Sequence, residues 1–216
     1  MKCRFCVRDP GSAATHFLGF LIVIPVFVVL LREAFLQASI AHLIGFSIFG
    51  LSLLLLYGAS TVYHTLVVSE EKQFLLRQID HIMIFVLIAG TYTPICLISL
   101  QGVWGSVLLV LIWILAAMGI LWKMVWMQAP RWLSTALYVF MGWLAVIALV
   151  PLKQAVDWNG IRVLLYGGVM YTVGAVIYAL KKPNPNWKHF GFHEIFHVFV
   201  LLGSGFHIAF MFFYVL

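Results

Sequence analysis

The chain has 216 residues, of which 64% are hydrophobic and only 9% are charged. A soluble domain carries roughly a quarter charged residues, so this composition excludes a soluble protein and predicts an integral membrane protein. The net charge of +6 lies mainly between apolar stretches, which indicates contact with anionic lipid headgroups and does not indicate a nucleic acid partner.

Seven apolar stretches, each near or above the roughly 20 residues that a helix needs to cross a bilayer, occupy almost the whole chain. The connections between them are too short for a second domain. We therefore expect an all-α membrane protein, a single seven-transmembrane-helix bundle over residues 1–216 with a short cytoplasmic tail at 1–13. The stretches run at about 14–32, 38–63, 80–100, 103–122, 132–151, 161–180 and 192–215.

Basic residues predict the orientation of this bundle. Lys2, Arg4 and Arg8 precede the first stretch as in a signal peptide, but a clear cleavage site is missing and the stretch is long enough to span, so we expect it to be retained. With the N-terminus inside, ten lysines and arginines lie in inner segments and three in outer segments. This asymmetry predicts an inside N-terminus and an outside C-terminus. The ten are Lys2, Arg4, Arg8, Lys72, Arg77, Lys123, Arg131, Lys181, Lys182 and Lys188; the three are Arg32, Lys153 and Arg162.

The three cysteines carry little functional signal. Cys3 and Cys6 form one CxxC in the N-terminal tail, and a single CxxC without a second pair or a nearby histidine is a weak indication of a metal or redox site. Cys96 lies in an apolar stretch and is expected to behave as a small hydrophobic residue.

Three groups of polar residues from distant sequence positions are predicted to reach one level of the membrane on the cytoplasmic side. His193 and His197 are four residues apart, so they lie on one face of a helix and can bind the same metal ion. The second stretch ends near His64 and the third begins near Asp80, both at the inner face where the seventh begins. Ser60 lies one turn before His64 on the same face. Ionisable groups at membrane depth are functional candidates because they are costly there.

These residue types suit zinc chemistry. Three histidines plus water form a catalytic zinc site, in which the metal lowers the pKa of that water from about 15.7 towards 7. A nearby carboxylate can orient a ligand or hold the water. The alternative is that the histidines form unrelated hydrogen bonds between helices and that Asp80 pairs with Arg77 or a helix N-terminus.

Several motifs in order resemble a known family. They are Ser60-x-x-Tyr63-His64, Asp80-His81, Gly90-Thr91-Tyr92-Thr93-Pro94, Met141-Gly142-Trp143 and His193-x-x-x-His197. Together they resemble the hemolysin III branch of the progestin and adipoQ receptor (PAQR) superfamily, over about residues 9–215. The resemblance implies a seven-helix fold, an inward N-terminus and zinc near the cytoplasmic face. It also implies that His64, His193 and His197 bind zinc, while Ser60 and Asp80 hold or contact the water on that zinc.

Two features do not follow simply from this resemblance. Bacterial relatives usually carry acidic residues, then Asn, then His at the first helix, where this chain has Asp9, Ser12 and His16. We expect His16 to form a hydrogen bond between helices, although it could neighbour the site. Glu194 completes a literal HExxH, the motif of zinc proteases in which Glu is the general base. The chain ends within the same helix and offers no further downstream ligand helix, so we expect that match to be coincidental.

The leading hypothesis is a zinc-dependent membrane hydrolase that acts on lipid amide or acyl bonds at the inner leaflet. The resemblance extends to ceramidase-like hydrolases, which favours amide cleavage. His64, His193 and His197 would be the metal ligands, Asp80 the base that orients the water and Ser60 its hydrogen-bond partner. The alternatives are a non-enzymatic sensor or regulator of membrane state with structural zinc, a hemolysin-like activity, and an intramembrane metalloprotease. A membrane lipid is the expected substrate or ligand.

Overall fold

The protein folds as a bundle of helices that alternate in direction, as a computed structural model shows for residues 7–100, 102–185 and 187–216. Cys3 and Cys6 lie outside these described residues. Within them, seven helical segments are long and apolar enough to cross a membrane, which confirms the predicted fold class. The helices are α1 (Pro10–Leu36), α2 (Ile40–Thr65), α3 (Glu70–Pro94), α4 (Val103–Val125), α5 (Arg131–Trp143), α6 (Leu149–Ala155), α7 (Trp158–Leu180) and α8 (Phe192–Phe210).

Three segments depart from α-helical geometry without breaking a span. The π-helix η1 (Ile95–Ser99) continues α3, and the π-helix η3 (Met211–Val215) continues α8. The 3₁₀-helix η2 (Leu144–Ala148) joins α5 to α6, so these two helices form one span. Pro94 directly precedes η1, and proline removes a backbone donor and clashes with the preceding turn, which accounts for the change in geometry there.

The third span starts ten residues earlier than hydropathy indicates. The apolar pattern places its beginning near Asp80, but α3 begins at Glu70. Glu70, Glu71 and Lys72 lower the local hydropathy, yet all are good helix formers, and the two acidic residues in the first turn suit the positive end of the helix dipole. Asp80 therefore lies about 15 Å along the helix from its start, because each residue adds about 1.5 Å.

The first helix begins against the end of the second. Pro10 occupies the first turn of α1, where its missing N–H costs nothing. The backbone N–H groups of Arg8 and Asp9 donate to the carbonyls of Thr65 and His64 at 3.3 and 2.9 Å. This backbone pairing holds the start of α1 beside the last turn of α2.

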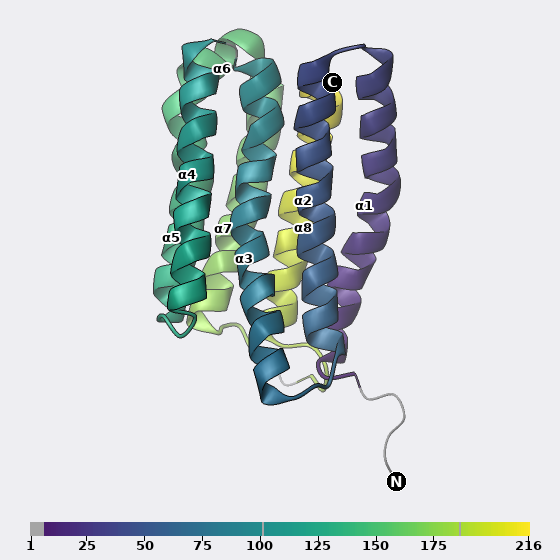
Figure 1. The fold of residues 1–216 in the computed structure, drawn as a ribbon, viewed down its shortest axis with the longest axis vertical. Helices are drawn as coiled ribbons and strands as arrows, with labels where there is room; N and C mark the ends of the chain where they lie inside the picture. The colour runs from purple at the N-terminus through teal and green to yellow at the C-terminus, as the bar shows by residue number, and fades with distance from the viewer. Residues whose placement is uncertain (1–6, 101, 186) are drawn as a thin grey trace.

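The helices alternate in direction (Figure 1), so most of the basic residues lie at one end of the bundle. α1, α3, α5 and α8 begin at one end, which we call the basic end, and α2, α4 and α7 finish there. The C-terminal Leu216 lies at the opposite end. Eight of the ten basic residues predicted to be inside lie in described segments at the basic end, and Arg32, Lys153 and Arg162 lie at the opposite end.

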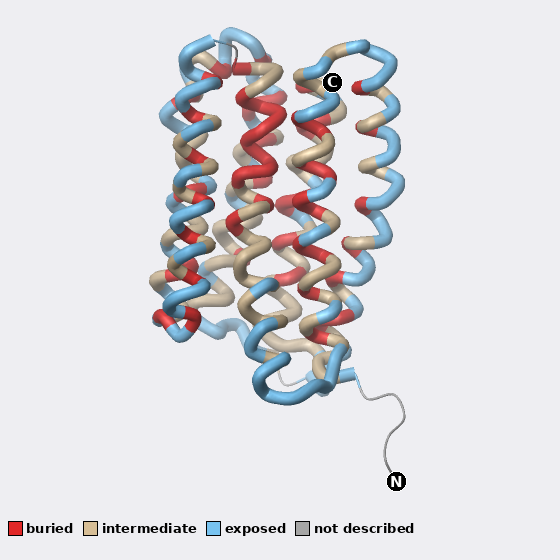
Figure 2. The backbone as a smooth tube through the Cα atoms, viewed as in Figure 1, coloured by how far each residue is buried: buried red, intermediate tan, exposed pale blue. Residues whose placement is uncertain are grey.

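Large apolar side chains face outward along the spans. Figure 2 shows exposed positions along the outer sides of α1 and α4, and buried positions facing the interior. Phe17, Val28, Val107 and Met118 are about half exposed or more. Such a continuous exposed apolar surface suits lipid, in agreement with a membrane protein.

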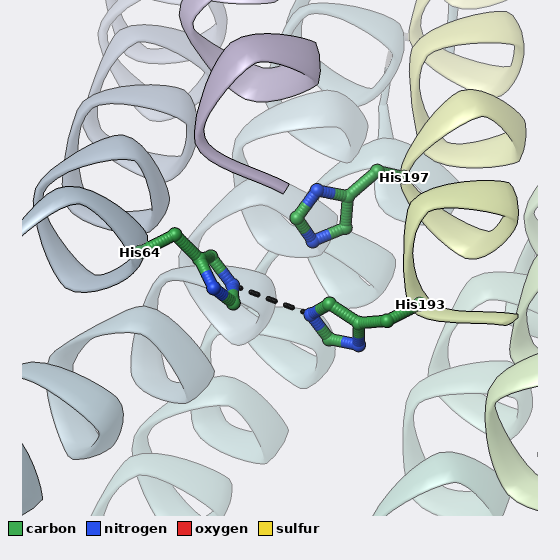
Figure 3. A group of neighbouring side chains, drawn as sticks. All are labelled: His64, His193 and His197. Atoms are coloured by element: carbon green, nitrogen blue, oxygen red, sulfur yellow. Dashed lines mark hydrogen bonds between the residues drawn. The ribbon is translucent and has the colours of Figure 1, made fainter. Parts of the chain in front are cut away.

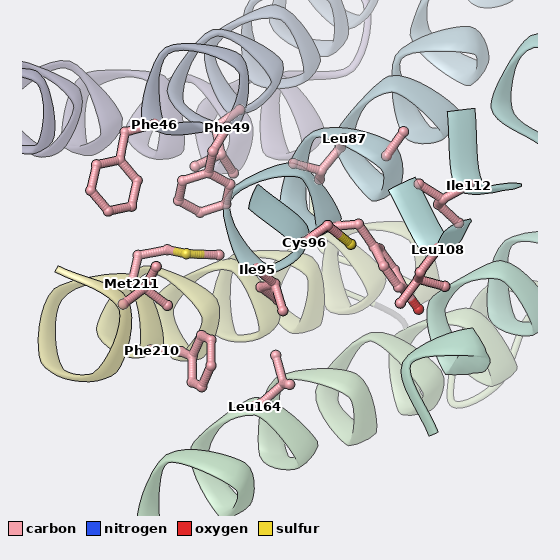
Figure 4. Packing of buried hydrophobic residues seen from close by; sticks show 14 of the residues in the cluster. Phe46, Phe49, Leu87, Ile95, Cys96, Leu108, Ile112, Leu164, Phe210 and Met211 are labelled. Carbon is pink, nitrogen blue, oxygen red and sulfur yellow. The ribbon is translucent and has the colours of Figure 1, made fainter. Parts of the chain in front are cut away.

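Much of the apolar core lies towards the end of the bundle away from the histidines. Phe46 and Phe49 of α2, Ile112 of α4, Phe210 of α8 and Met211 of η3 have no exposed surface and belong to one apolar core (Figure 4). Many of the polar side chains, including the three histidines, lie nearer the basic end of the bundle.

Glycines allow α7 and α8 to approach each other closely. A Cβ atom at Gly203 would lie 2.8 Å from the ring of Tyr171, and one at Gly174 would lie 2.9 Å from Cβ of Phe199. Small residues are typical of such helix contacts in membranes. The close packing fixes the first turns of α8, where two of the candidate ligands lie.

Candidate metal centre

Three histidines from distant sequence positions meet at the basic end. His64 lies in the last turn of α2, and His193 and His197 lie in the first two turns of α8. One ring nitrogen from each lies within 4.8 Å of the others. The Nε2 atoms of His64 and His193 are 3.2 Å apart (Figure 3). The structure thus brings together the three residues that the sequence singled out as ligands.

The spacing of these nitrogens fits a zinc ion. Zinc binds histidine nitrogen at about 2.0–2.1 Å in tetrahedral geometry, which places two ligand nitrogens about 3.3 Å apart. The distance between the Nε2 atoms of His64 and His193 is close to that value. His197 is buried, its ring lies beside the other two (Figure 3), and its ligand nitrogen is within 4.8 Å of theirs.

Hydrogen bonds orient two of the three rings. Nδ1 of His64 donates to Oδ2 of Asp9 at 3.0 Å. Nδ1 of His197 lies 3.3 Å from the backbone oxygen of Ser12 and 3.0 Å from Oγ1 of Thr15. A histidine that donates one N–H in this way presents its other nitrogen to a metal. The start of α1 therefore supplies the partners that fix His64 and His197.

Asp9 is held as a carboxylate. Burial alone would raise the pKa of Asp9, but hydrogen bonds from His64 and Arg8 outweigh burial and lower that pKa below its usual value. The Arg8 guanidinium lies 2.6 Å from Oδ2 of Asp9. An ionised Asp9 strengthens its hydrogen bond with His64. The sequence pattern does not assign this role to Asp9; an acidic residue just before Pro10 is the available signal.

Ser60 and Asp80 line the same cavity as the histidines. Ser60 is buried one turn before His64, and its hydroxyl lies within interacting range of the Asp80 carboxylate. Asp80 forms no ion pair within the described chain, so the alternative pairing with Arg77 is not found. Both side chains are thus available to a small molecule beside the histidines.

The predicted hydrogen bond of His16 to a neighbouring helix is wrong, because both nitrogens of this buried ring lack a partner among the described residues. His16 is 3% exposed. Its ring stacks on His197 with 3.5 Å between ring centroids and 8° between planes. His16 also lines the cavity, because α1 turns this face towards α8. His16 therefore packs against the ring of the candidate ligand His197.

Glu194 is engaged in holding its own helix. Oε2 accepts a hydrogen bond from the backbone N–H of Gly191 at 2.8 Å, and Oε1 accepts one from Ser12 Oγ. A carboxylate in the first turn also suits the helix dipole. With both oxygens occupied, Glu194 caps α8 and connects it to α1, which gives the HExxH match a structural explanation.

A large cavity joins these groups. Its volume is about 890 Å³, and it reaches from the three histidines to His207, which lies ten residues beyond His197, or about 15 Å along α8. Its deeper wall is largely apolar, with polar side chains such as Thr91, Tyr171 and His207 set into it; the apolar residues there include Leu56, Ile84, Leu87, Ile88, Leu164 and Val200. Other polar residues at the basic end, Arg77, Lys123, Arg131 and Ser134, line its mouth.

Comparisons with known proteins agree with this architecture. Residues 6–208 match the family described as haemolysin-III related. The chain is 43% identical to the hemolysin-3 homolog of Bacillus subtilis (strain 168), with 98% of this chain and 95% of that protein covered. It is 38% identical to hemolysin-3 of Bacillus cereus, with 99% and 92% covered.

A more distant relative extends the likeness. The chain is 26% identical to an adiponectin receptor protein of Drosophila melanogaster, over 92% of this chain and 49% of that protein. From the family match, the identities and the seven-span fold, the chain belongs to the haemolysin-III-related family, within the progestin and adipoQ receptor superfamily.

Proposed function

We propose that this membrane protein is a zinc-dependent hydrolase that cleaves an amide or acyl bond of a membrane lipid at the cytoplasmic side. The observation that carries the proposal is the set of three convergent histidines at one end of an 890 Å³ cavity with an apolar wall. Ligand cavities of about 300–1,000 Å³ with a few polar groups suit small molecules. The long apolar wall favours an acyl chain as the bound group.

The number of ligands supports a catalytic role over a structural one. Structural zinc sites are closed by four protein ligands, whereas catalytic sites use three and leave one position open. Among the described residues, the group that could hold a metal has three members, His64, His193 and His197. This count favours the hydrolase over a regulator in which zinc only braces α2 and α8.

The side chains around the histidines have complementary tasks. When bound, zinc would supply a positive charge that acidifies a water molecule and polarises the substrate carbonyl. The Asp80 carboxylate would accept a proton from the attacking water, and Ser60 Oγ would hold that water through a hydrogen bond. The water oxygen bonds to the acyl carbon, the carbon–nitrogen bond breaks, and Asp80 returns the proton to the leaving nitrogen. A fatty acid and an amine result.

The test compares lipid hydrolysis with zinc content and stability. Purified protein would be assayed for fatty-acid release from a panel of lipid amides and esters. Asp80→Asn should lower turnover at least about a hundredfold, since a general base contributes that much or more, and should keep its zinc and melting temperature. Glu71→Gln, an exposed carboxylate on the same helix, is the matched control and should act like the wild type.

Two results together would overturn the hydrolase. They are no fatty-acid release by the wild type from the whole panel, and a large loss of melting temperature in Asp80→Asn. Asp80 would then be a structural residue, and the regulator with structural zinc would replace the enzyme.

A further inference from the structure

One buried and one half-buried cation, Lys123 and Arg77, lie at the mouth of the cavity without an ion pair among the described residues. Lys123, in the last turn of α4, is 1% exposed. Its Nζ donates to Ser134 Oγ at 2.6 Å and lies 4.9 Å from the ring of Trp122, both neutral groups. Nε of Arg77, on α3, is buried and has no hydrogen-bond partner among the described residues. Both side chains line the cavity.

The structure joins these cations into one cluster. Gln78, next to Arg77, donates from Nε2 to the backbone oxygens of Lys123 and Met124 at 3.0 and 3.2 Å. Arg77 and Lys123 therefore line the same cavity on neighbouring helices. His81 lies one turn after Arg77 on the same face of α3 and also lines the cavity.

The carboxylates of the cavity do not neutralise these two cations. Asp9 pairs with Arg8 and His64, and Glu194 is bound by Ser12 and Gly191. Asp80 forms no ion pair in the described chain. Burying unpaired positive charges in a membrane protein is costly, so such groups indicate a bound anion.

We propose that Arg77 and Lys123 bind the phosphate of an anionic membrane lipid whose acyl chain lies along the apolar wall of the same cavity. Arginine and lysine are the usual protein partners of phosphate, and basic pockets between transmembrane helices suit lipid headgroups. A phosphate monoester carries about −1.5 to −2 charge, which balances two cations better than the single charge of a carboxylate.

The dimensions of the cavity agree with this ligand. The cations lie near helix ends, at the level where headgroups meet the hydrocarbon layer. The cavity also includes Ile95, eighteen residues after Arg77 on the same span, or roughly 27 Å deeper. The neighbouring Arg131 is already engaged: its guanidinium lies 4.7 Å from the Tyr178 ring and donates to the Tyr178 backbone oxygen. The lipid-binding site itself does not depend on the hydrolase proposal. Only the further step, that the bound lipid is also the substrate, rests on that proposal.

The experiment measures binding and not turnover. Full-length protein would be titrated with phosphatidic acid and with diacylglycerol of the same acyl chains, with native mass spectrometry and thermal shift as readouts. Phosphatidic acid should bind the wild type at least about tenfold more tightly, because charge-assisted hydrogen bonds are worth that much. Arg77→Gln and Lys123→Met should each lose most of this preference.

The matched control is Lys72→Gln, which removes an exposed cation from the same end of α3 that does not line the cavity. It should keep the preference. Lys123→Met conserves volume and removes an unpaired buried charge, so its melting temperature without lipid should hold or rise. If Lys123→Met binds phosphatidic acid more weakly but is as stable as the wild type, the loss of binding is not caused by misfolding.

Several outcomes would overturn the inference. Equal binding of phosphatidic acid and diacylglycerol would contradict a phosphate site. A preference for phosphatidic acid that remains in both Arg77→Gln and Lys123→Met would contradict its assignment to these two residues. Equal protection by inorganic phosphate alone would assign the cluster to a free anion, and equal protection by the free fatty acid would assign it to a carboxylate. If the protein prefers phosphatidic acid to diacylglycerol but hydrolyses no lipid, the phosphate-binding site is supported and only the hydrolase proposal is rejected.

Discussion

Oδ2 of Asp9 lies 3.0 Å from Nδ1 of His64, although the two residues are 55 positions apart in the sequence. Asp9 directly precedes α1 and His64 lies in the last turn of α2. The contact turns Nε2 of His64 towards His193, so a residue outside the ligand set fixes the geometry within it.

This contact predicts a role for Asp9 in metal affinity. Asp9→Asn should weaken zinc binding by about 10–100-fold, the usual effect of removing a carboxylate partner of a metal-binding histidine. Competition with a chelator of known affinity measures the change. Glu33→Gln, which removes a carboxylate paired with Arg32 at the other end of α1, is the control and should bind zinc as the wild type does.

The three histidines predict about one zinc per chain in the purified protein. His64→Ala, His193→Ala and His197→Ala should each lose most of it by elemental analysis. His189→Ala should keep it, because His189 is an exposed histidine in the α7–α8 connection. Near-zero zinc in the wild type and in all four variants would remove the metal site.

The contacts of Glu194 predict a stability effect without loss of chemistry. Glu194→Gln should lower the free energy of unfolding by about 1 kcal/mol, as expected for a weakened helix cap. Zinc content and any lipid turnover should remain near wild-type levels. Ser12→Ala should cost a similar amount, and the double variant should cost less than the sum because the two side chains share a hydrogen bond. A thousandfold drop in turnover in Glu194→Gln alone would favour the metalloprotease.

The charge asymmetry predicts the orientation in the membrane. The loop at 181–188 should be labelled from the cytoplasm, and Leu216 should be reached from outside, because basic residues favour the cytoplasmic side. Single cysteines introduced at 188 and 216, probed with a membrane-impermeant reagent in intact cells, measure this. A Leu216 position that reacts only after the cells are opened would contradict the orientation.

The sequence alone was enough for the number of spans and for their approximate limits. Long apolar runs can be satisfied in lipid only as helices, because every backbone group must be hydrogen-bonded within the segment. The exception was α3, whose charged start at Glu70 obscured the helix in the hydropathy pattern. Helical spacing also determined that His193 and His197 share one face, because residues four positions apart lie about one turn from each other.

Tertiary structure decided which groups surround those histidines. Asp9, Thr15 and His16 contact His64 and His197 because α1 packs against both α2 and α8. Hydropathy gives the depth of a residue but neither the rotation of its helix nor the order of helices around the bundle. The same limit applies to Arg77 and Lys123. Their charges are plain in the sequence, but only the packing of α3 beside α4 brings both to the mouth of one cavity without an ion pair among the described residues.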